Sequence, residues 1–281
     1  MSIYIDGGGR TMKRTIAIVA LCAGIMLTTF PSQAKESGNV KINAKNFPDT
    51  IVREYVSEKI DKNNDGYLSK KEISAVKTII IDKNNLYWEN KEKLKEDYEI
   101  IDCKGLEIFT NVEKVKLTTY CDTYVSEYGN IKNIKVLTKL TKIKNLEISG
   151  VNNSNYDFTK LNNLERLCIK STKLKKLNLS KNVKLKNLKL AYNPLLKKIN
   201  LTKNKNLERI NLYGSGVKKI TLGKNNKIKN ANLNCTFISN YEKCNFNPKT
   251  LKTLKICNTQ IKKVQESKEI VSYKRGKSNW L

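Results

Sequence analysis

Residues 185–193 read LKNLKLAYN, and their spacing of aliphatic side chains returns every 21 to 23 positions along the chain. Self-similarity at a period of about 20 to 29 residues is typical of a solenoid, so we consider it before any local structure. The well-matched units are Leu164-x-x-Leu167-x-Ile169, Leu185-x-x-Leu188-x-Leu190, Leu207-x-x-Ile210-x-Leu212, Ile228-x-x-Ala231-x-Leu233 and Leu251-x-x-Leu254-x-Ile256.

Several units carry a second aliphatic phrase, as in Leu174-x-x-Leu177-x-Leu179, Leu196-x-x-Ile199-x-Leu201 and Val217-x-x-Ile220-x-Leu222. About six aliphatic side chains per turn cannot offset the conformational entropy that the turn loses on ordering. Each turn must therefore bury its apolar edge against its neighbour. We expect one cooperative array with a cap at each end.

The phrase Leu-x-x-Leu-x-Leu-x-x-Asn, best kept at Leu185 to Asn193, resembles the leucine-rich repeat. Hydroxyl residues replace the Asn elsewhere, at Thr172, Ser215, Thr236 and Thr259. The resemblance covers roughly Val112 to Val264 and implies an α/β solenoid with a parallel β-sheet on its concave face. In that family the polar side chain bonds the backbone inside the coil, and a hydroxyl can do the same more weakly.

Two further phrases, Val112-x-x-Val115-x-Leu117 and Ile143-x-x-Leu146-x-Ile148, extend the array to seven turns. They lie 31 residues apart. The extra length, residues 118–142, predicts an insertion or an irregular turn with a helical piece near residues 131–140. Residues 84–111 read as a connector and amino-terminal cap, and residues 265–281 as a carboxyl-terminal cap or tail.

The chain carries 54 basic and 26 acidic residues, a formal net charge of +28. Only six of the basic residues are Arg, while Lys, Asn and Ile are abundant. This usage is typical of an AT-rich genome and favours solubility, but a body so basic would also adhere to polyanions. Sequence-specific nucleic-acid binding is disfavoured, because proteins of that kind depend on bidentate contacts from Arg to the bases. Binding of single strands is disfavoured as well, because it requires aromatic residues interleaved with cations.

The chain has no His. This excludes nucleophiles activated by His and zinc sites that contain His. No spacing of carboxylates or lysines indicates an acid–base pair either. We therefore expect a protein that is not an enzyme.

The amino terminus is typical of a secretory signal. Residues 1–10 read as an upstream extension, after which Met12, Lys13 and Arg14 precede an apolar run over residues 15–30. Small residues stand at the −3 and −1 positions of a cleavage site after Ala34. The apolar run is shorter than the roughly 20 residues of a membrane span, and Leu21 before Cys22 argues against a lipoprotein signal. Residues 1–34 therefore predict a secreted or cell-surface protein without a membrane span after cleavage.

Residues 35–83 form a module of another kind. Pro48 and Asp49 open an amphipathic helical pattern, and the dodecapeptide 61–72 reads DKNNDGYLSKKE. It matches the calcium-loop pattern Asp-x-[Asp/Asn]-x-[Asp/Asn]-Gly-x5-Glu at every constrained position, and it resembles an EF-hand. A second helix is predicted from Ile73 to about Ile80.

Calcium takes six to eight oxygen ligands. The resemblance to an EF-hand assigns them to Asp61, Asn63, Asp65, the Tyr67 carbonyl, Ser69 through water, and bidentate Glu72. Gly66 would allow the sharp turn, and Leu68 would enter the core between the helices. Since no second loop pairs with this one, Ca²⁺ as a structural ligand, a degenerate loop without metal and a sensor all remain open.

The order of signal peptide, EF-hand-like module and repeats resembles secreted leucine-rich repeat proteins of Gram-positive, clostridial-type bacteria. That likeness concerns architecture and names no ligand. Six cysteines follow residue 34. Cys103 with Cys121, and Cys235 with Cys244 or Cys257, could form disulfides in a secreted chain, whereas Cys168 would stay free; reduced thiols throughout are the alternative.

Strand residues that flank the buried aliphatic positions point out of the concave face. One such column is Lys116, Glu147, Cys168, Lys189, Asn211, Asn232 and Lys255, and the next is Thr118, Ser149, Lys170, Ala191, Tyr213, Asn234 and Cys257. Tyr and Arg are favoured in binding hot spots. The predicted ligand-binding residues are Lys170, Lys189, Tyr192, Arg209, Asn211, Tyr213 and Asn232.

Three functions follow from these patterns. The first is a non-catalytic recognition protein that binds a protein or glycan on the concave sheet. The second is a Lys-rich surface protein held electrostatically on anionic cell-wall polymers. An enzyme is the third and the least supported.

Overall fold

The structure, a computed structural model, describes residues 38–83, 100–119, 121–122, 127–261 and 272–274. The predicted signal peptide and most of the predicted connector lie outside these residues. The described residues belong to one compact body. No helix among the described residues is long and apolar enough to span a membrane.

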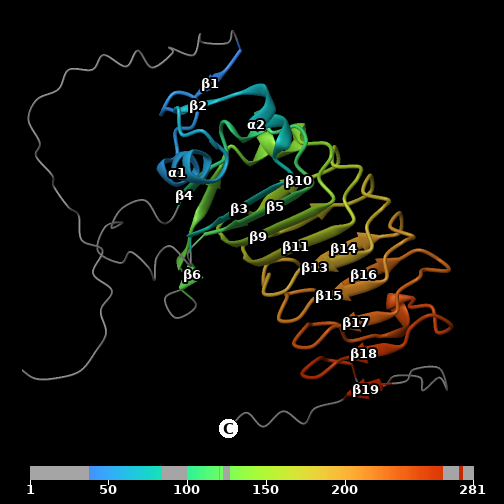
Figure 1. Cartoon of the computed structure of the whole chain (residues 1–281). Helices are drawn as coiled ribbons and strands as arrows, with labels where there is room; N and C mark the ends of the chain where they lie inside the picture. Colours follow the sequence, from blue (N-terminus) through green and yellow to red (C-terminus); the bar gives the residue numbers. More distant parts are fainter. Residues whose placement is uncertain (1–37, 84–99, 120, 123–126, 262–271, 275–281) are drawn as a thin grey trace, which may run out of the picture. The chain divides into compact units, whose positions relative to one another are not determined.

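The body is organised around one parallel sheet of nine strands. In spatial order from the amino-terminal edge, its strands are β3 (Thr78–Asp82), β5 (Lys114–Thr118), β9 (Asn145–Val151), β11 (Arg166–Thr172), β13 (Asn187–Lys189), β15 (Arg209–Asn211), β17 (Asn230–Asn232), β18 (Thr253–Lys255) and β19 (Ser272–Lys274). Each strand lies beside the next one from the following turn, as in a ladder (Figure 1). This is the α/β leucine-rich repeat solenoid that the sequence predicts.

The repeat phrase sets the register of this ladder. Leu167 pairs with Leu188, Leu188 with Ile210, and Ile210 with Ala231, and the row continues to Leu254. All five side chains are buried. The predicted interior row of aliphatic side chains is therefore confirmed.

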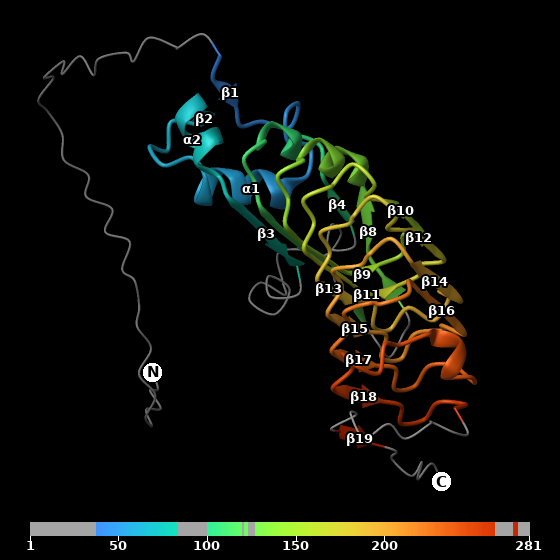
Figure 2. The same ribbon diagram turned by 90° about the vertical axis from the view of Figure 1, so that its right-hand side faces the viewer.

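The second aliphatic phrase forms a layer opposite the large sheet. Its short strands are β10 (Asn155–Asp157), β12 (Lys176–Asn178), β14 (Lys198–Leu201) and β16 (Lys219–Leu222). Figure 2 shows this layer along the opposite side of the coil from β11, β13 and β15, with a 3₁₀ turn (Glu242–Cys244) continuing it. The aliphatic side chains of both layers meet in a single core.

Buried polar side chains bond the backbone inside the coil. Asn193 donates from Nδ2 to the carbonyls of Ile169 and Ala191 and accepts a hydrogen bond from the Thr172 hydroxyl. Hydroxyls take over this role in later turns, because Thr236 donates to the Leu233 carbonyl and Thr259 donates to that of Ile256. The predicted substitution of Asn by hydroxyl residues is confirmed at Thr236 and Thr259. It is wrong at Ser215, whose buried Oγ has no hydrogen-bond partner within the described residues.

A second row of buried amides, which the sequence analysis missed, runs along the opposite layer. Asn182 Nδ2 donates to the carbonyls of Phe158 and Leu161, and Asn204 Nδ2 donates to those of Leu179 and Asn182. Asn226 continues the row one turn later. Each amide satisfies carbonyls that the tight turn leaves without a strand partner.

The amino-terminal module contains two helices, α1 (Thr50–Lys59) and α2 (Lys70–Ala75), on either side of the 61–72 loop. A short antiparallel pair, β1 (Val40–Lys41) with β2 (Tyr67–Leu68), joins the loop to the start of the module. Leu68 is fully buried. The prediction that the second helix reaches Ile80 is wrong: the backbone is already extended at Val76, and Thr78–Asp82 is the first strand of the large sheet.

Helix α1 closes the amino-terminal edge of the sheet. The Tyr55 hydroxyl donates to the Thr78 carbonyl of β3 at 3.2 Å and accepts a hydrogen bond from the Ile80 N–H at 3.3 Å. One phenol thus occupies two of the backbone groups on this edge that a further strand would use. Burial raises the pKa of this hydroxyl, which keeps it protonated and able to donate. Edge strands covered in this way do not pair with other chains.

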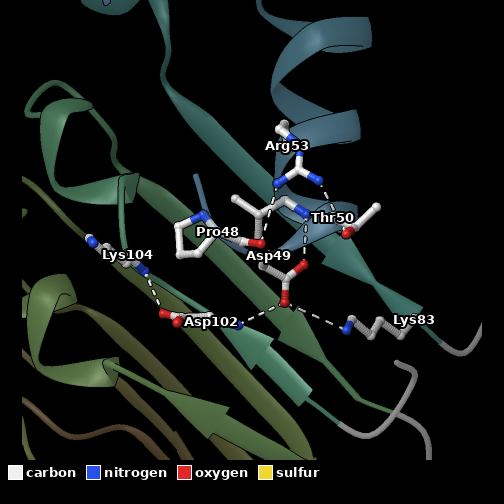
Figure 3. A network of polar contacts seen from close by, with 8 residues as sticks. Pro48, Asp49, Thr50, Arg53, Lys83, Asp102 and Lys104 are labelled. Atoms are coloured by element: carbon white, nitrogen blue, oxygen red, sulfur yellow. Dashed lines mark hydrogen bonds and ion pairs between the residues drawn. The ribbon is translucent and has the colours of Figure 1, made fainter. Parts of the chain in front are cut away.

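Asp49 connects the same helix to the solenoid, as Figure 3 shows. Its Oδ1 accepts a hydrogen bond from Val52 N at the start of α1, and its Oδ2 accepts one from Asp102 N in β4 (Ile100–Asp102). The same Oδ2 lies 3.7 Å from Nζ of Lys83, a lysine that is only 1% exposed. One carboxylate therefore caps a helix, holds a strand and neutralises a buried cation.

The long segment between β5 and β9 is irregular, as predicted, but it is built differently. It contains β6 (Cys121–Asp122), β7 (Glu127–Tyr128) and β8 (Asn130–Lys132), the last paired in parallel with β4. The expected helical piece near residues 131–140 is a 3₁₀ helix (Ile134–Lys139). Another 3₁₀ helix, Leu106–Ile108, lies before β5 in the chain. The count of seven turns is too low for the sheet, which gains β3 and β19 at its two ends.

The cysteines whose side chains the structure describes are free thiols: Cys103, Cys168, Cys235, Cys244 and Cys257. The predicted pairings of Cys235 with Cys244 or Cys257 are therefore absent from the described part of the fold. A pairing of Cys103 is absent as well. The alternative of reduced thiols fits these residues.

We predict that Asn204→Ala destabilises the solenoid by about 1 to 3 kcal/mol, because the carbonyls of Leu179 and Asn182 each lose one of their two donors and the buried amide is removed. Urea unfolding followed by circular dichroism measures this change. Asn162→Ala, at an exposed asparagine, is the matched control and should stay within about 0.5 kcal/mol of the parent. Equal stability of the two variants would contradict the role of the second amide row.

We predict that Asp49→Ala lowers the free energy of unfolding by about 3 kcal/mol, because it removes a helix cap and withdraws the carboxylate from a buried ammonium. Asp49→Asn can still accept the Val52 hydrogen bond, so it should lose less than the alanine variant. Thermal unfolding of both variants gives the comparison. If the alanine variant is as stable as the parent, Asp49 does not fasten the module to the solenoid.

Candidate functional site

The outward side of the large sheet forms a groove of about 900 Å³. Strands β5 to β18 contribute its lining. The groove arises because a strand alternates its side chains between faces. The repeat phrase assigns one face to the aliphatic core, so the residues immediately before and after each buried aliphatic side chain must point outward.

Two columns of side chains therefore form the floor of the groove. The column that follows the aliphatic row contains Lys116, Glu147, Cys168, Lys189, Asn211, Asn232 and Lys255. The column that precedes it contains Lys114, Asn145, Arg166, Asn187, Arg209, Asn230 and Thr253. The sequence analysis identified the first column but took only Arg209 from the second. The alternation of side chains along a strand was sufficient to find both.

The structure divides the predicted ligand-binding residues into two groups. Lys189, Arg209, Asn211 and Asn232 line the groove. The other three residues, Lys170, Tyr192 and Tyr213, are not part of its lining and lie beyond it, three or four residues after the buried row.

Ion pairs within the protein occupy some of the cations near the groove and leave others able to bind a ligand. Lys170 Nζ lies 3.2 Å from Glu147 Oε1. Lys116 Nζ lies 2.6 Å from Asp82 Oδ2, and this hydrogen bond raises the pKa of Lys116. Within the described residues, Lys189 and Arg209 take part in no ion pair, so their charges face the groove without compensation.

The amides of the following column are oriented by the backbone. Asn211 Oδ1 accepts a hydrogen bond from Tyr213 N at 3.0 Å, and Asn232 Oδ1 accepts one from Asn234 N at 3.1 Å. Their Nδ2 groups remain as donors. Together with the cations, these amides make the floor rich in hydrogen-bond donors.

Two tyrosines on successive turns form an aromatic rim beside the groove. The rings of Tyr192 and Tyr213 meet edge to face with centroids 5.1 Å apart. Tyr192 adopts a left-handed conformation with φ of 55° and is 52% exposed. Its ring lies over Gly214, where a Cβ would come within 3.0 Å of Tyr192 Cδ1. Glycine at this position thus makes room for the aromatic pair.

The Tyr213 hydroxyl lies among polar neighbours. The Cys235 thiol raises its pKa, and Tyr192 adds to the shift. The hydroxyl therefore remains protonated at physiological pH. The rim offers aromatic area with polar ends, which is the character of residues that dominate protein interfaces.

Two thiols, Cys168 in the groove and Cys244 on the opposite layer, are poor nucleophiles. Burial raises the pKa of Cys168, in the groove, to about 11, and that of Cys244 also to about 11. A cysteine attacks as its thiolate, so these groups are inert at neutral pH. The floor is arranged for binding through donors and charge.

The 61–72 loop is a separate candidate site for calcium. Asp61 Oδ2 accepts a hydrogen bond from Gly66 N at 2.9 Å, and Asp65 Oδ1 accepts one from Tyr67 N at 2.8 Å. Glu72 folds back across the loop, where its Oε1 accepts from Lys62 N at 2.7 Å. Backbone hydrogen bonds of this kind lower the pKa of Glu72, against an opposing effect of burial.

The remaining loop contacts bear on whether the residues fit the metal. Glu72 Oε2 accepts hydrogen bonds from Ser69 N and Oγ, so this pair also caps helix α2. No group of three or more acidic, Cys or His side chains is gathered for a metal among the described residues. Asp61 Oδ1, however, is buried without a hydrogen-bond partner in a residue that is 3% exposed. An orphaned carboxylate oxygen within an all-oxygen donor set fits a hard cation.

The fold defines the class of this protein: it is a leucine-rich repeat solenoid. It is similar to internalin C2 of Listeria monocytogenes, with a TM-score of 0.63 and 16% sequence identity over 85% of this chain and 97% of that one. A second internalin of that species (inlF) matches with a TM-score of 0.50 and 16% identity over 80% of this chain and 74% of that one. No family model and no curated protein sequence matches the chain. At these identities the likeness shows the fold alone.

Proposed function

We propose that this chain is an extracellular recognition protein that binds a protein ligand through the concave sheet. The observation that carries the proposal is the groove itself, whose floor presents unpaired cations and amide donors beside an exposed aromatic rim. Such a combination of charge, donors and Tyr side chains is typical of a recognition surface. The aliphatic core beneath it keeps the surface rigid.

The proposed extracellular location rests on residues 1–34, whose basic, apolar and small-residue regions follow one another as in a secretory signal. A glycan remains a second kind of ligand for the same groove, since amides and tyrosines also bind sugar hydroxyls. We favour a protein because the rim pairs aromatic area with charge.

A second function, adhesion to anionic cell-wall polymers, is supported by lysines on the opposite layer. Three successive turns each present two adjacent exposed lysines: Lys175 and Lys176, Lys197 and Lys198, and Lys218 and Lys219. The register of β14 and β16 places Lys198 directly beside Lys219. Attraction by such exposed charges is screened over about 8 Å at physiological ionic strength.

To test the proposed function, the chain is used to capture surface proteins and cell-wall fractions, and the same capture is repeated with Tyr192→Ala/Lys189→Ala. We expect the variant to lose at least tenfold in affinity for a captured protein, because two groups on and beside the groove floor are removed. Surface plasmon resonance measures the affinity. Each side chain is exposed, so folding should be unaffected and is checked by thermal unfolding.

The matched control is Lys176→Gln/Lys219→Gln, which removes two charges from the opposite layer. Unchanged affinity of this control supports the concave sheet as the binding surface. Loss in the control alone, together with release from cell-wall fractions by moderate salt, would replace recognition with electrostatic adhesion.

Within the same proposal, Ca²⁺ acts as a structural ligand of the amino-terminal module. Asp61, Asn63, Asp65, Glu72, the Tyr67 carbonyl and Ser69 through water would hold it. The bound ion would neutralise the loop carboxylates and fix α1 against α2. Because α1 also covers the edge of the sheet through Tyr55, ordering of the loop would stabilise the amino-terminal end of the solenoid.

We expect calcium, compared with EDTA, to raise the thermal midpoint of the full chain, because a ligand that binds only the folded state stabilises it. Asp65→Ala should abolish this response, whereas Lys62→Ala, in the same loop, should retain it. Scanning calorimetry provides the readout. The metal assignment fails if Asp65→Ala responds to calcium as strongly as the parent.

A further inference from the structure

The column of the groove that precedes the buried aliphatic row alternates between cations and amides. From β5 to β17, one residue per turn, it reads Lys114, Asn145, Arg166, Asn187, Arg209 and Asn230. The charge pattern therefore has a period of two turns, although the aliphatic pattern has a period of one. Packing of the core does not require this longer period, because these side chains point away from it.

The residues immediately before these form a further column, which alternates between glutamates and lysines in the same phase. Its charges neutralise one another through ion pairs. Glu113 pairs with Lys144 at 2.9 Å, Glu165 with Lys186 at 3.0 Å, and Glu208 with Lys229 at 3.2 Å. Each acid is thus occupied by a lysine of the following turn. The hydrogen bond from Lys144 lowers the pKa of Glu113, and that from Lys186 lowers the pKa of Glu165.

Those ion pairs leave Lys114, Arg166 and Arg209 without an acidic partner within the described ranges of the chain. All three side chains are exposed and line the groove. Arginine is rare here, with six in the whole chain. Of the others, Arg53 bonds the backbone near Pro48, and three lie outside the described residues. Where lysine is the usual cation, two arginines in one column indicate a need for the planar, bidentate guanidinium.

The spacing of the three cations matches the spacing of side chains in one backbone conformation of a polypeptide ligand. Neighbouring strands lie about 4.8 Å apart, so cations two turns apart are separated by about 9.6 Å. A polyproline II helix advances about 3.1 Å per residue with three residues per turn, so every third side chain returns to the same side after about 9.3 Å. In a β-strand the same-side spacing is about 6.6 Å, which does not match.

The amides between the cations suit the same ligand. Asn145, Asn187 and Asn230 are half-buried in the floor, and their side chains make no hydrogen bond within the described structure. A polyproline II segment has no internal hydrogen bonds, so its peptide groups need external partners. A side-chain amide both donates and accepts, and it can therefore bind a peptide group. A phosphodiester group, in contrast, offers acceptors only.

We propose that the groove binds an acidic polypeptide segment in the polyproline II conformation, with Asp or Glu at every third position. The proposal rests on the function proposed above and names its ligand class. The carboxylates of the segment pair with Lys114, Arg166 and Arg209, and its peptide groups meet the intervening asparagines. Lys189 and the Nδ2 groups of Asn211 and Asn232 add donors along the column that follows the aliphatic row.

The test uses the full chain and three fluorescent probes, followed by anisotropy at one fixed ionic strength. The first peptide is a proline-rich segment with three aspartates at every third position. The second has the same length and composition, but its aspartates stand at alternate positions. The third probe is poly(glycerol phosphate). We expect the first peptide to bind at least tenfold more tightly than the second.

Variants locate the binding. Arg166→Gln/Arg209→Gln should weaken the first peptide at least tenfold, while Lys176→Gln/Lys219→Gln, with the same loss of charge on the opposite layer, should stay within about twofold. For Arg166→Lys/Arg209→Lys the loss of affinity should fall between these two values, because the charge remains but the planar, bidentate guanidinium is lost. All substituted residues are exposed, and thermal unfolding confirms that each variant folds.

Three results would overturn the inference. They are equal affinity for the two peptides, equal loss in both charge-removing variants, and tighter binding of poly(glycerol phosphate) than of either peptide. If any of these occurs while Tyr192→Ala/Lys189→Ala still abolishes binding of a captured protein, recognition by the concave sheet stands and only the ligand class is wrong. If that variant has no effect either, both proposals fall.

Discussion

The structure depends on one constraint: the aliphatic side chains of a turn can be buried only by the turns beside it. A turn with about six such residues has too little apolar surface to fold alone, and stacking supplies the missing contacts. The close approach that results is visible at Gly216, where a Cβ would lie 1.9 Å from the Pro194 carbonyl oxygen of the preceding turn. Spacing between turns is therefore fixed by the backbone. Every surface column inherits that fixed spacing.

The ends of such a stack need special treatment, and the amino-terminal module provides it. Tyr55 satisfies two backbone groups on the edge of β3 with one hydroxyl. Asp49 joins α1, β4 and Lys83 with one carboxylate. The module resembles a metal-binding element in sequence, yet its contacts make it part of the solenoid's cap. Any ligand that orders the 61–72 loop would thus act on the stability of the whole stack.

The repeat phrase allowed the fold to be predicted because it encodes both the buried row and its period. The first strand was missed because Ile79, Ile80 and Ile81 form a continuous apolar run, from which a strand and a buried helix cannot be told apart. In the structure Ile80 is exposed while its neighbours are buried. The row of Asn182, Asn204 and Asn226 was missed because a polar residue has no periodic hydrophobic signal, although its spacing is as regular.

The site was only partly predictable for a related reason. Sequence shows which side chains leave the core, but not which charges remain once ion pairs form. Lys170 was counted as available and is paired with Glu147, whereas Arg166 was omitted and faces the groove. The pairing of Glu165 with Lys186 rather than with Arg166 became visible only when the turns were placed in register.

Exposed ion pairs of this kind contribute little to stability, typically less than about 1 kcal/mol each. Their larger effect is to choose which cations stay free. Among the described residues, the column that precedes the aliphatic row keeps one such cation in every second turn from β5 to β15. A single exposed cation binds an acid weakly. Three of them on a rigid sheet at a constant interval act together, because a ligand held at the first has a high effective concentration at the next. A repeating surface of this kind selects its ligand by interval as well as by charge, and the stacked core beneath it is what keeps the interval constant.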